Sequence, residues 1–208
     1  MLTFKHNKIE VLRGVIDPVA LDAVQRLVRL TLSGYADDPP GFFRSDPQVK
    51  LRYPLARMHL TEAIMYALTP KIREIVGAEV LPTYSFPVIN FPGAELERHT
   101  DRPACEVTCT LTLINEPETI WPIFIEEAPG KVHRLDLNPG DVAAYDGIAY
   151  PHWREAQPEG HYNVSVFYHY VLVGGPFEDW HRKELRQHMK LSELYEPKRL
   201  SQLFPTPP

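Results

Sequence analysis

The spacing of apolar residues changes near residue 80. Before that point, apolar residues recur every three or four positions over residues 17–34, which predicts an amphipathic helix with Asp17 as its N-cap. Two further helices are expected at 59–68 and 70–76, separated because Pro70 lacks the backbone N–H that a helix interior needs. These elements predict a mainly helical N-terminal part.

After residue 80 the apolar residues follow the two-residue period of β-strands. Residues 105–114 alternate cysteine or aliphatic side chains with glutamate or threonine, which predicts a strand with one buried face. Several short strands separated by Pro- and Gly-containing turns follow, and residues 162–173 predict a long closing strand. This pattern is typical of a sandwich, a barrel or a jelly roll.

The 208 residues are expected to form one domain with mostly β structure and flanking helices, an α+β arrangement. Its parts are a mainly helical segment over 1–79, a β core over 80–173, and a C-terminal helix and tail over 174–208. The tail helix is predicted around residues 178–194. Residues 35–57 are loop-like, and Phe42 and Phe43 within them could cover a site or fill a gap in the core.

The net charge and the cysteine content limit which classes of partner and which cellular location are expected. The formal net charge is −5 and Lys and Arg form no long run, so nucleic acid and anionic membranes are not expected partners. No apolar run approaches the roughly 18 residues of a membrane-spanning helix, and the N-terminus lacks the plan of a signal peptide. Cys105 and Cys109 are interpreted as reduced core thiols, which favours a cytoplasmic location.

One short motif carries the strongest chemical signal. His99 and Asp101 lie two residues apart, so in an extended segment both side chains leave the same face. His152 is the candidate for a third ligand. Two imidazoles and one carboxylate that leave other coordination positions open are the ligand set of non-haem Fe(II) oxygenases.

These residues, with Gly93 before the motif and a Pro-Gly-Asp turn at 139–141 before His152, resemble the 2-oxoglutarate- and Fe(II)-dependent oxygenase superfamily. The resemblance covers about residues 80–173. It implies a double-stranded β-helix, or jelly roll, with the N-terminal helices packed on it.

The resemblance also implies an activity. Fe(II) would be held by His99, Asp101 and His152, with 2-oxoglutarate as co-substrate and dioxygen as oxidant. Decarboxylation of 2-oxoglutarate to succinate would be coupled to oxidation of a C–H bond, most simply hydroxylation. The primary substrate would be a small molecule, an amino acid or a peptidyl residue.

One position departs from the family pattern. Such enzymes often bind the distal carboxylate of 2-oxoglutarate with an Arg-x-Ser pair on the last strand, where this chain has Asn163 and Ser165. A neutral amide cannot neutralise a buried carboxylate, so another cation is required. Arg154, two residues after His152, is the first candidate and Arg102 is the second.

Two other functions stay open on the sequence alone. A cupin-like metalloenzyme that does not use 2-oxoglutarate is favoured by the missing Arg-x-Ser pair and disfavoured by the His-x-Asp spacing. A non-catalytic jelly-roll binding module is disfavoured by the three intact ligands. The sequence carries no signal for an oligomeric state.

Overall fold

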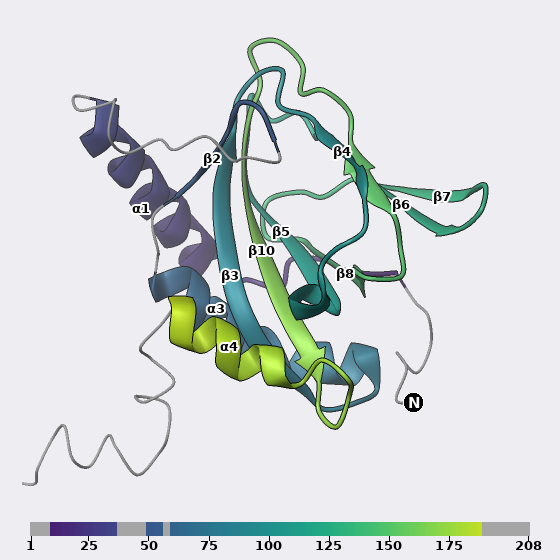
Figure 1. The fold of residues 1–208 in the computed structure, drawn as a ribbon. Coiled ribbons are helices and arrows are strands. Elements are labelled where there is room, and N and C mark those ends of the chain that lie inside the picture. Colours follow the sequence, from purple (N-terminus) through teal and green to yellow (C-terminus); the bar gives the residue numbers. More distant parts are fainter. Residues whose placement is uncertain (1–8, 37–48, 56–58, 189–208) are drawn as a thin grey trace, which may run out of the picture.

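The computed structural model describes residues 9–36, 49–55 and 59–188, and its strands form two facing sheets (Figure 1). The six-stranded sheet has the order β1-β8-β5-β10-β3-β2 and the four-stranded sheet the order β4-β9-β6-β7, with antiparallel neighbours throughout. The strands are β1 (Glu10–Leu12), β2 (Arg52–Pro54), β3 (Val80–Asn90), β4 (Leu96–His99), β5 (Val107–Glu116), β6 (Ile123–Ala128), β7 (Lys131–Leu135), β8 (Val142–Asp146), β9 (His152–Arg154) and β10 (Tyr162–Leu172). This architecture confirms the predicted jelly roll with flanking helices.

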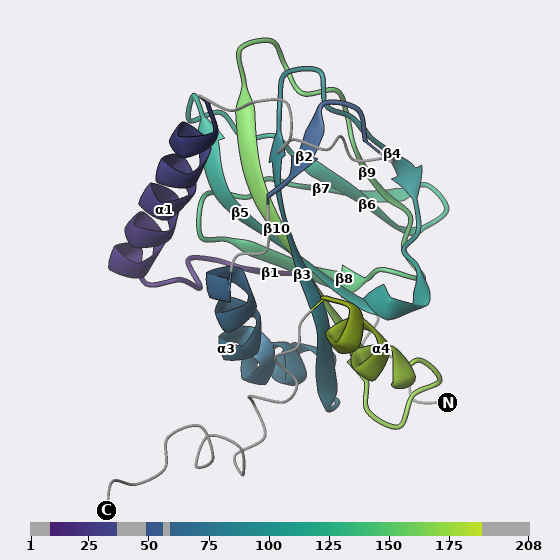
Figure 2. The same cartoon turned by 60° about the vertical axis from the view of Figure 1, so that its left-hand side comes forward.

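Two of the three helices, those nearest the N-terminus, cover the outer face of the six-stranded sheet (Figure 2). The helices are α1 (Pro18–Ala36), α3 (His59–Val76) and α4 (Asp179–His188), with a 3-10 turn η1 at Pro103–Cys105. Apolar residues of α1 and α3 join one core cluster with β5, β8 and β10, whereas α4 lies against β3 and η1 (Figure 2). The predicted cap is confirmed, because Asp17 Oδ1 accepts hydrogen bonds from the backbone N–H groups of Val19 and Ala20 at 3.0 and 3.2 Å.

The predicted break at Pro70 is wrong, because α3 runs through it without interruption. A proline inside a helix costs about 3 kcal/mol or more. Buried Met65 and Leu68 before it, and Ile72 and Val76 after it, lie on one continuous face against the sheet and offset that cost. The expected end at residue 76 is confirmed, with Gly77 following the helix at φ 67°.

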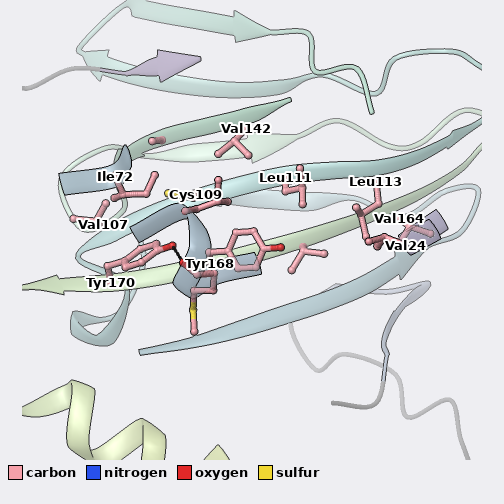
Figure 3. Packing of buried hydrophobic residues seen from close by; sticks show 14 of the residues in the cluster. Val24, Ile72, Val107, Cys109, Leu111, Leu113, Val142, Val164, Tyr168 and Tyr170 are labelled. Carbon is pink, nitrogen blue, oxygen red and sulfur yellow. Dashed lines mark hydrogen bonds between the residues drawn. The ribbon is translucent and has the colours of Figure 1, made fainter. Parts of the chain in front are cut away.

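Strand β5 is buried on both faces, so the prediction of one buried face is also wrong. Val107, Cys109 and Leu111 face the helices in the main core, where they pack with Tyr168 and Tyr170 of β10 (Figure 3). The alternate threonines face the four-stranded sheet and are at most 1% exposed: Thr108, Thr110 and Thr112. Their hydroxyl groups therefore line the interior between the sheets.

The N-terminal part and the tail differ from expectation in detail. Strands β1 and β2 add to the edges of the six-stranded sheet, and β2 lies within the segment predicted to be a loop. The predicted roles of Phe42 and Phe43 concern positions outside the described residues. Helix α4 confirms the tail helix as far as residue 188, and the rest of its predicted length lies outside the described residues.

Both cysteines are buried free thiols, as predicted. Burial raises the pKa of the Cys105 thiol to about 12 and raises that of Cys109 as well. No helix in the described part of the chain combines the length and the apolar character that a membrane span requires.

Candidate metal centre

The two candidate histidines are brought together by strand pairing. His99 ends β4 and His152 begins β9, and the two residues are direct partners in the antiparallel register of these strands. Their ring centroids are 4.4 Å apart, with an angle of 53° between the ring planes. Residues directly opposite each other in a sheet project from the same face, so the register itself sets the separation of the imidazoles.

The Asp101 carboxylate completes the group from the loop that follows β4. Its backbone N–H donates a hydrogen bond of 2.8 Å to the carbonyl of Gly147. Its Oδ1 lies 3.6 Å from Nε2 of His99 and 3.7 Å from Nε2 of His152. The three potential ligand atoms all lie within 4.8 Å of one another, which is compatible with binding of one metal ion.

Backbone carbonyls orient both imidazoles. Nδ1 of His99 lies 2.8 Å from the carbonyl oxygen of Glu97, and Nδ1 of His152 lies 2.9 Å from that of Tyr150. Each Nδ1 therefore carries the proton and donates it, because a carbonyl can only accept. The Nε2 lone pairs are left facing Asp101, as metal coordination requires.

In the absence of a metal, the surroundings favour the metal-binding protonation state at Asp101 and His152 and the charged imidazolium at His99. Burial opposes the charge of Asp101, but the imidazoles and the Thr108 hydroxyl outweigh it and lower the pKa of the carboxyl. Burial lowers the pKa of His152, whereas the neighbouring carboxylate raises that of His99. A divalent cation binds the carboxylate and neutral imidazoles, so its binding would displace the proton that Asp101 favours on His99.

A cavity of about 520 Å³ opens beside these three residues. His152 is buried, whereas the side chains of Asp101 and His99 are 15% and 31% exposed. Much of the remaining wall is apolar or aromatic, including Leu55, Tyr84, Phe86, Pro87 and Phe167. This volume falls within the range of small-molecule pockets.

Solved structures with similar folds support the same interpretation of the architecture. No protein-family model matches the chain, and no curated protein sequence matches it. A 2OG-Fe(II) oxygenase family oxidoreductase from Burkholderia pseudomallei superposes with TM-score 0.59 at 13% identity, over 84% of this chain and 89% of that one. A prolyl-4-hydroxylase from Pseudomonas putida gives 0.58 at 14%, over 81% and 95%.

A third structure shows the range of activities on this fold. The epimerase SnoN, in complex with Fe3+, alpha ketoglutarate and nogalamycin RO, gives a TM-score of 0.60 at 14% identity, over 80% of its own chain and 81% of this one. The chain has the fold of the 2-oxoglutarate- and Fe(II)-dependent oxygenases. At these identities the similarity extends to the fold alone.

At the position where 2-oxoglutarate oxygenases often have an arginine, this chain has a neutral hydrogen-bond network. Asn163 Oδ1 accepts hydrogen bonds from Asn90 Nδ2 at 3.1 Å and from the Ser165 hydroxyl at 2.6 Å. Asn163 Nδ2 donates to Asn115 Oδ1 at 2.8 Å. Both Asn163 and Ser165 are buried in β10, and neither is among the described residues that line the cavity.

Arg154 is a buried cation without a carboxylate partner among the described residues. Its Nη1 donates to the carbonyl of Trp121, and its guanidinium lies 4.7 Å from the centroid of that indole. Its Nε and Nη2 are buried and have no hydrogen-bond partner in the described structure. Burial, and to a lesser extent the nearby charge of Arg52, lower the pKa of Arg154 to about 9.

Arg154 itself is absent from the described lining of the cavity, but Tyr145 and Arg52, which interact with it electrostatically, do line it. Arg52 was missed at the sequence level because its segment lacks strand periodicity. It sits on β2, donates from Nε to Asn90 Oδ1 at 3.0 Å, and lies 5.3 Å from the Phe167 ring centroid. Its position on an edge strand gives no signal in the sequence alone.

Arg102 lines the cavity but is engaged elsewhere. Its Nη1 donates to the Glu184 carboxylate on α4, and its guanidinium lies over the rings of Tyr84 and Trp180 at 5.0 and 5.7 Å. Burial opposes its charge, but Glu184 raises the pKa of Arg102 above its ordinary value. This ion pair attaches the C-terminal helix to the rim of the cavity.

Proposed function

We propose that this protein is an Fe(II)- and 2-oxoglutarate-dependent oxygenase, with His99, Asp101 and His152 as the metal ligands. The observation that carries the proposal is the convergence of these three ligand atoms beside a cavity of about 520 Å³. The jelly-roll fold supports it, because the similar solved structures include iron- and 2-oxoglutarate-dependent proteins.

The residues present fit such a metal. Each imidazole has its Nδ1–H committed to a backbone carbonyl, so only Nε2 is available to a cation. Three protein ligands leave further coordination positions for co-substrate and dioxygen. When bound, the metal and 2-oxoglutarate supply the oxidising chemistry, and the protein supplies ligands, orientation and exclusion of water.

Arg154 is the proposed anchor for the distal carboxylate of 2-oxoglutarate. Two of its guanidinium nitrogens are buried without a partner in the described structure, which costs free energy unless an anion binds there. It lies two residues after His152 on β9, so both side chains project from the same face of that strand. Arg52, which lines the cavity, adds positive charge beside it. Arg102 is less suitable because Glu184 already neutralises it.

The proposed primary substrate is a small molecule, an amino acid or a peptidyl residue, and the proposed outcome is hydroxylation. The apolar and aromatic cavity wall supports a substrate with a C–H bond held in a dry environment. Because one similar structure is an epimerase, an outcome other than hydroxylation is included in the proposal. A cytoplasmic location stays a prediction from the two reduced cysteines.

A metalloenzyme that does not use 2-oxoglutarate is the second candidate. It is favoured by one observation, the neutral Asn163 network at the position where the family usually has its arginine. It would use the same three ligands, so metal binding alone does not separate it from the first candidate.

Anaerobic absorption spectroscopy separates the two. Wild-type protein loaded with Fe(II) is titrated with 2-oxoglutarate, and chelation is expected to give a weak visible metal-to-ligand charge-transfer band. Succinate release in air, with and without candidate substrates, is the second readout. Tight Fe(II) binding with neither the band nor succinate would favour the second candidate. Absence of Fe(II) binding would contradict both.

A further inference from the structure

A threonine and a histidine outside the metal ligands lie in contact with the Asp101 carboxylate. We infer that Thr108 and His169 are positioning residues that hold Asp101 in its metal-binding orientation. This inference rests on the proposed function, because it concerns the same metal centre. Neither residue would touch the metal.

The contacts form a chain of buried polar groups. Thr108 Oγ1 lies 2.6 Å from Asp101 Oδ2 and 3.1 Å from His169 Nδ1. Thr108 projects from β5 and His169 from the neighbouring β10, where the two residues are register partners. Thr108 is 1% exposed and His169 is 6% exposed. All three residues line the cavity, so these hydrogen bonds lie in its wall beside the proposed metal ligands.

The chemistry of the three groups determines which one donates and which one accepts in each hydrogen bond. The ionised carboxylate of Asp101 can only accept, so the single proton of the Thr108 hydroxyl points to Oδ2. That hydroxyl must then accept from His169, which places the imidazole proton on Nδ1. The hydrogen bonds thus run from His169 to Thr108 to Asp101. The carbonyl of Cys105, 3.1 Å from the hydroxyl, is a second acceptor for the same proton.

These hydrogen bonds give the two carboxylate oxygens of Asp101 different roles. Oδ2 is held by Thr108, while Oδ1 faces the Nε2 atoms of His99 and His152. The arrangement favours a ligand that offers the metal one oxygen, which keeps other coordination positions available. Removing the hydroxyl would free the carboxylate to rotate and would leave Oδ2 buried without its donor.

Gly147 lies close to the side chains of both Thr108 and Asp101. A Cβ at this position would lie 2.4 Å from Thr108 Oγ1 and 2.5 Å from Asp101 Oδ2. The backbone of Gly147 also accepts the Asp101 N–H hydrogen bond. The close approach of the glycine therefore confines both the hydroxyl and the carboxylate.

Cobalt(II) binding to the metal-free protein tests the inference without relying on turnover. Affinity is measured by anaerobic titration, and the cobalt d–d absorption reports the ligand geometry. Changes to groups that orient metal ligands typically weaken metal binding about 10- to 100-fold. Thr108→Val is expected to show such a loss with an altered spectrum, and Thr108→Ser, which keeps the hydroxyl, to recover most of the affinity.

A control variant at Thr112 and two substitutions of His169 complete the test. Thr112→Val lies on the same face of β5, equally buried, and is expected to bind cobalt like wild type. His169→Leu is expected to weaken binding more than His169→Asn, because Asn keeps a donor near the Nδ1 position. If circular dichroism shows that Thr108→Val does not fold, the cobalt affinities and spectra of His169→Leu and His169→Asn decide the question.

The outcomes separate this inference from the proposed function. No cobalt binding by wild type would overturn the metal centre itself, and the inference with it. Normal wild-type binding, together with unchanged affinity and spectrum in Thr108→Val or in both His169 variants, would overturn the positioning role alone.

Discussion

His99 and His152 are direct cross-strand partners of β4 and β9, so the two imidazoles owe their proximity to strand register. A slip of one residue in this pairing would turn one imidazole to the opposite face of the sheet. Asp101 then needs only a short loop after β4 to reach both rings. The geometry of the proposed metal centre therefore depends on the strand pairing at this edge of the four-stranded sheet.

Removing any one ligand is expected to abolish metal-dependent succinate formation. His99→Ala, Asp101→Ala and His152→Ala each leave two ligands, too few to hold the cation firmly. Succinate release and Fe(II) affinity are measured for each variant. His133→Ala is the matched control, because this histidine lies in the same sheet but pairs with Glu127 on the β6–β7 hairpin. Full turnover in any of the ligand variants would remove that residue from the site.

Arg154→Ala is expected to raise the KM for 2-oxoglutarate at least tenfold while Fe(II) affinity changes little. A hydrogen bond to a charged group contributes about 1.5–3 kcal/mol, and each 1.4 kcal/mol corresponds to a factor of ten. Steady-state kinetics with varied 2-oxoglutarate provides the measurement. Arg134→Ala, an exposed arginine on β7, serves as the control. An unaltered KM in Arg154→Ala, with an increase in Arg52→Ala, would transfer the anchoring role to Arg52.

Gly147→Ala is expected to weaken metal binding strongly. The new methyl group would overlap Asp101 Oδ2 and Thr108 Oγ1, so the carboxylate would have to move. Gly130→Ala is the control, since a Cβ there meets open space and only the positive φ of 79° is strained. That control should lower stability slightly and leave metal affinity unchanged. Wild-type affinity in Gly147→Ala would show that the pocket has more room than the structure indicates.

The buried His169 is expected to make the metal-free protein less stable in acid. Burial lowers the pKa of His169 from 6.5 to about 4, so between these values the unfolded chain binds a proton that the folded protein does not. Stability therefore falls as pH decreases through this window, by up to about 3 kcal/mol from this residue. Urea unfolding at about pH 7.5 and about pH 4.5 measures the loss.

His169→Leu should show a smaller difference between the two pH values than wild type, because leucine does not titrate. An equal difference in both proteins would mean that His169 contributes nothing to the acid sensitivity.

Local pattern in the sequence was sufficient for much of the architecture. The His-x-Asp spacing and the later His152 identify side chains that the structure brings together, although Asp101 lies in the loop after β4 and not on a shared strand face. The cap at Asp17 and the closing strand followed from equally local rules. The assignment of metal-ligand roles and the division of the chain into parts stay predictions.

Features that depend on distant packing were missed. The threonine face of β5 was expected to be exposed, because alternation of apolar and polar residues does not reveal a second sheet on the polar side. Pro70 was expected to break a helix that tertiary packing preserves. The pairing of Arg102 with Glu184 joins residues 82 positions apart, so no local pattern could reveal it.

The most direct test of the central claim is anomalous diffraction from crystals of wild-type protein grown without oxygen with Fe(II) and 2-oxoglutarate. One iron peak is expected, bonded to Nε2 of His99, Nε2 of His152 and one carboxylate oxygen of Asp101, with 2-oxoglutarate chelated to it. An iron peak elsewhere, or these two imidazoles turned away from any metal, would contradict this claim.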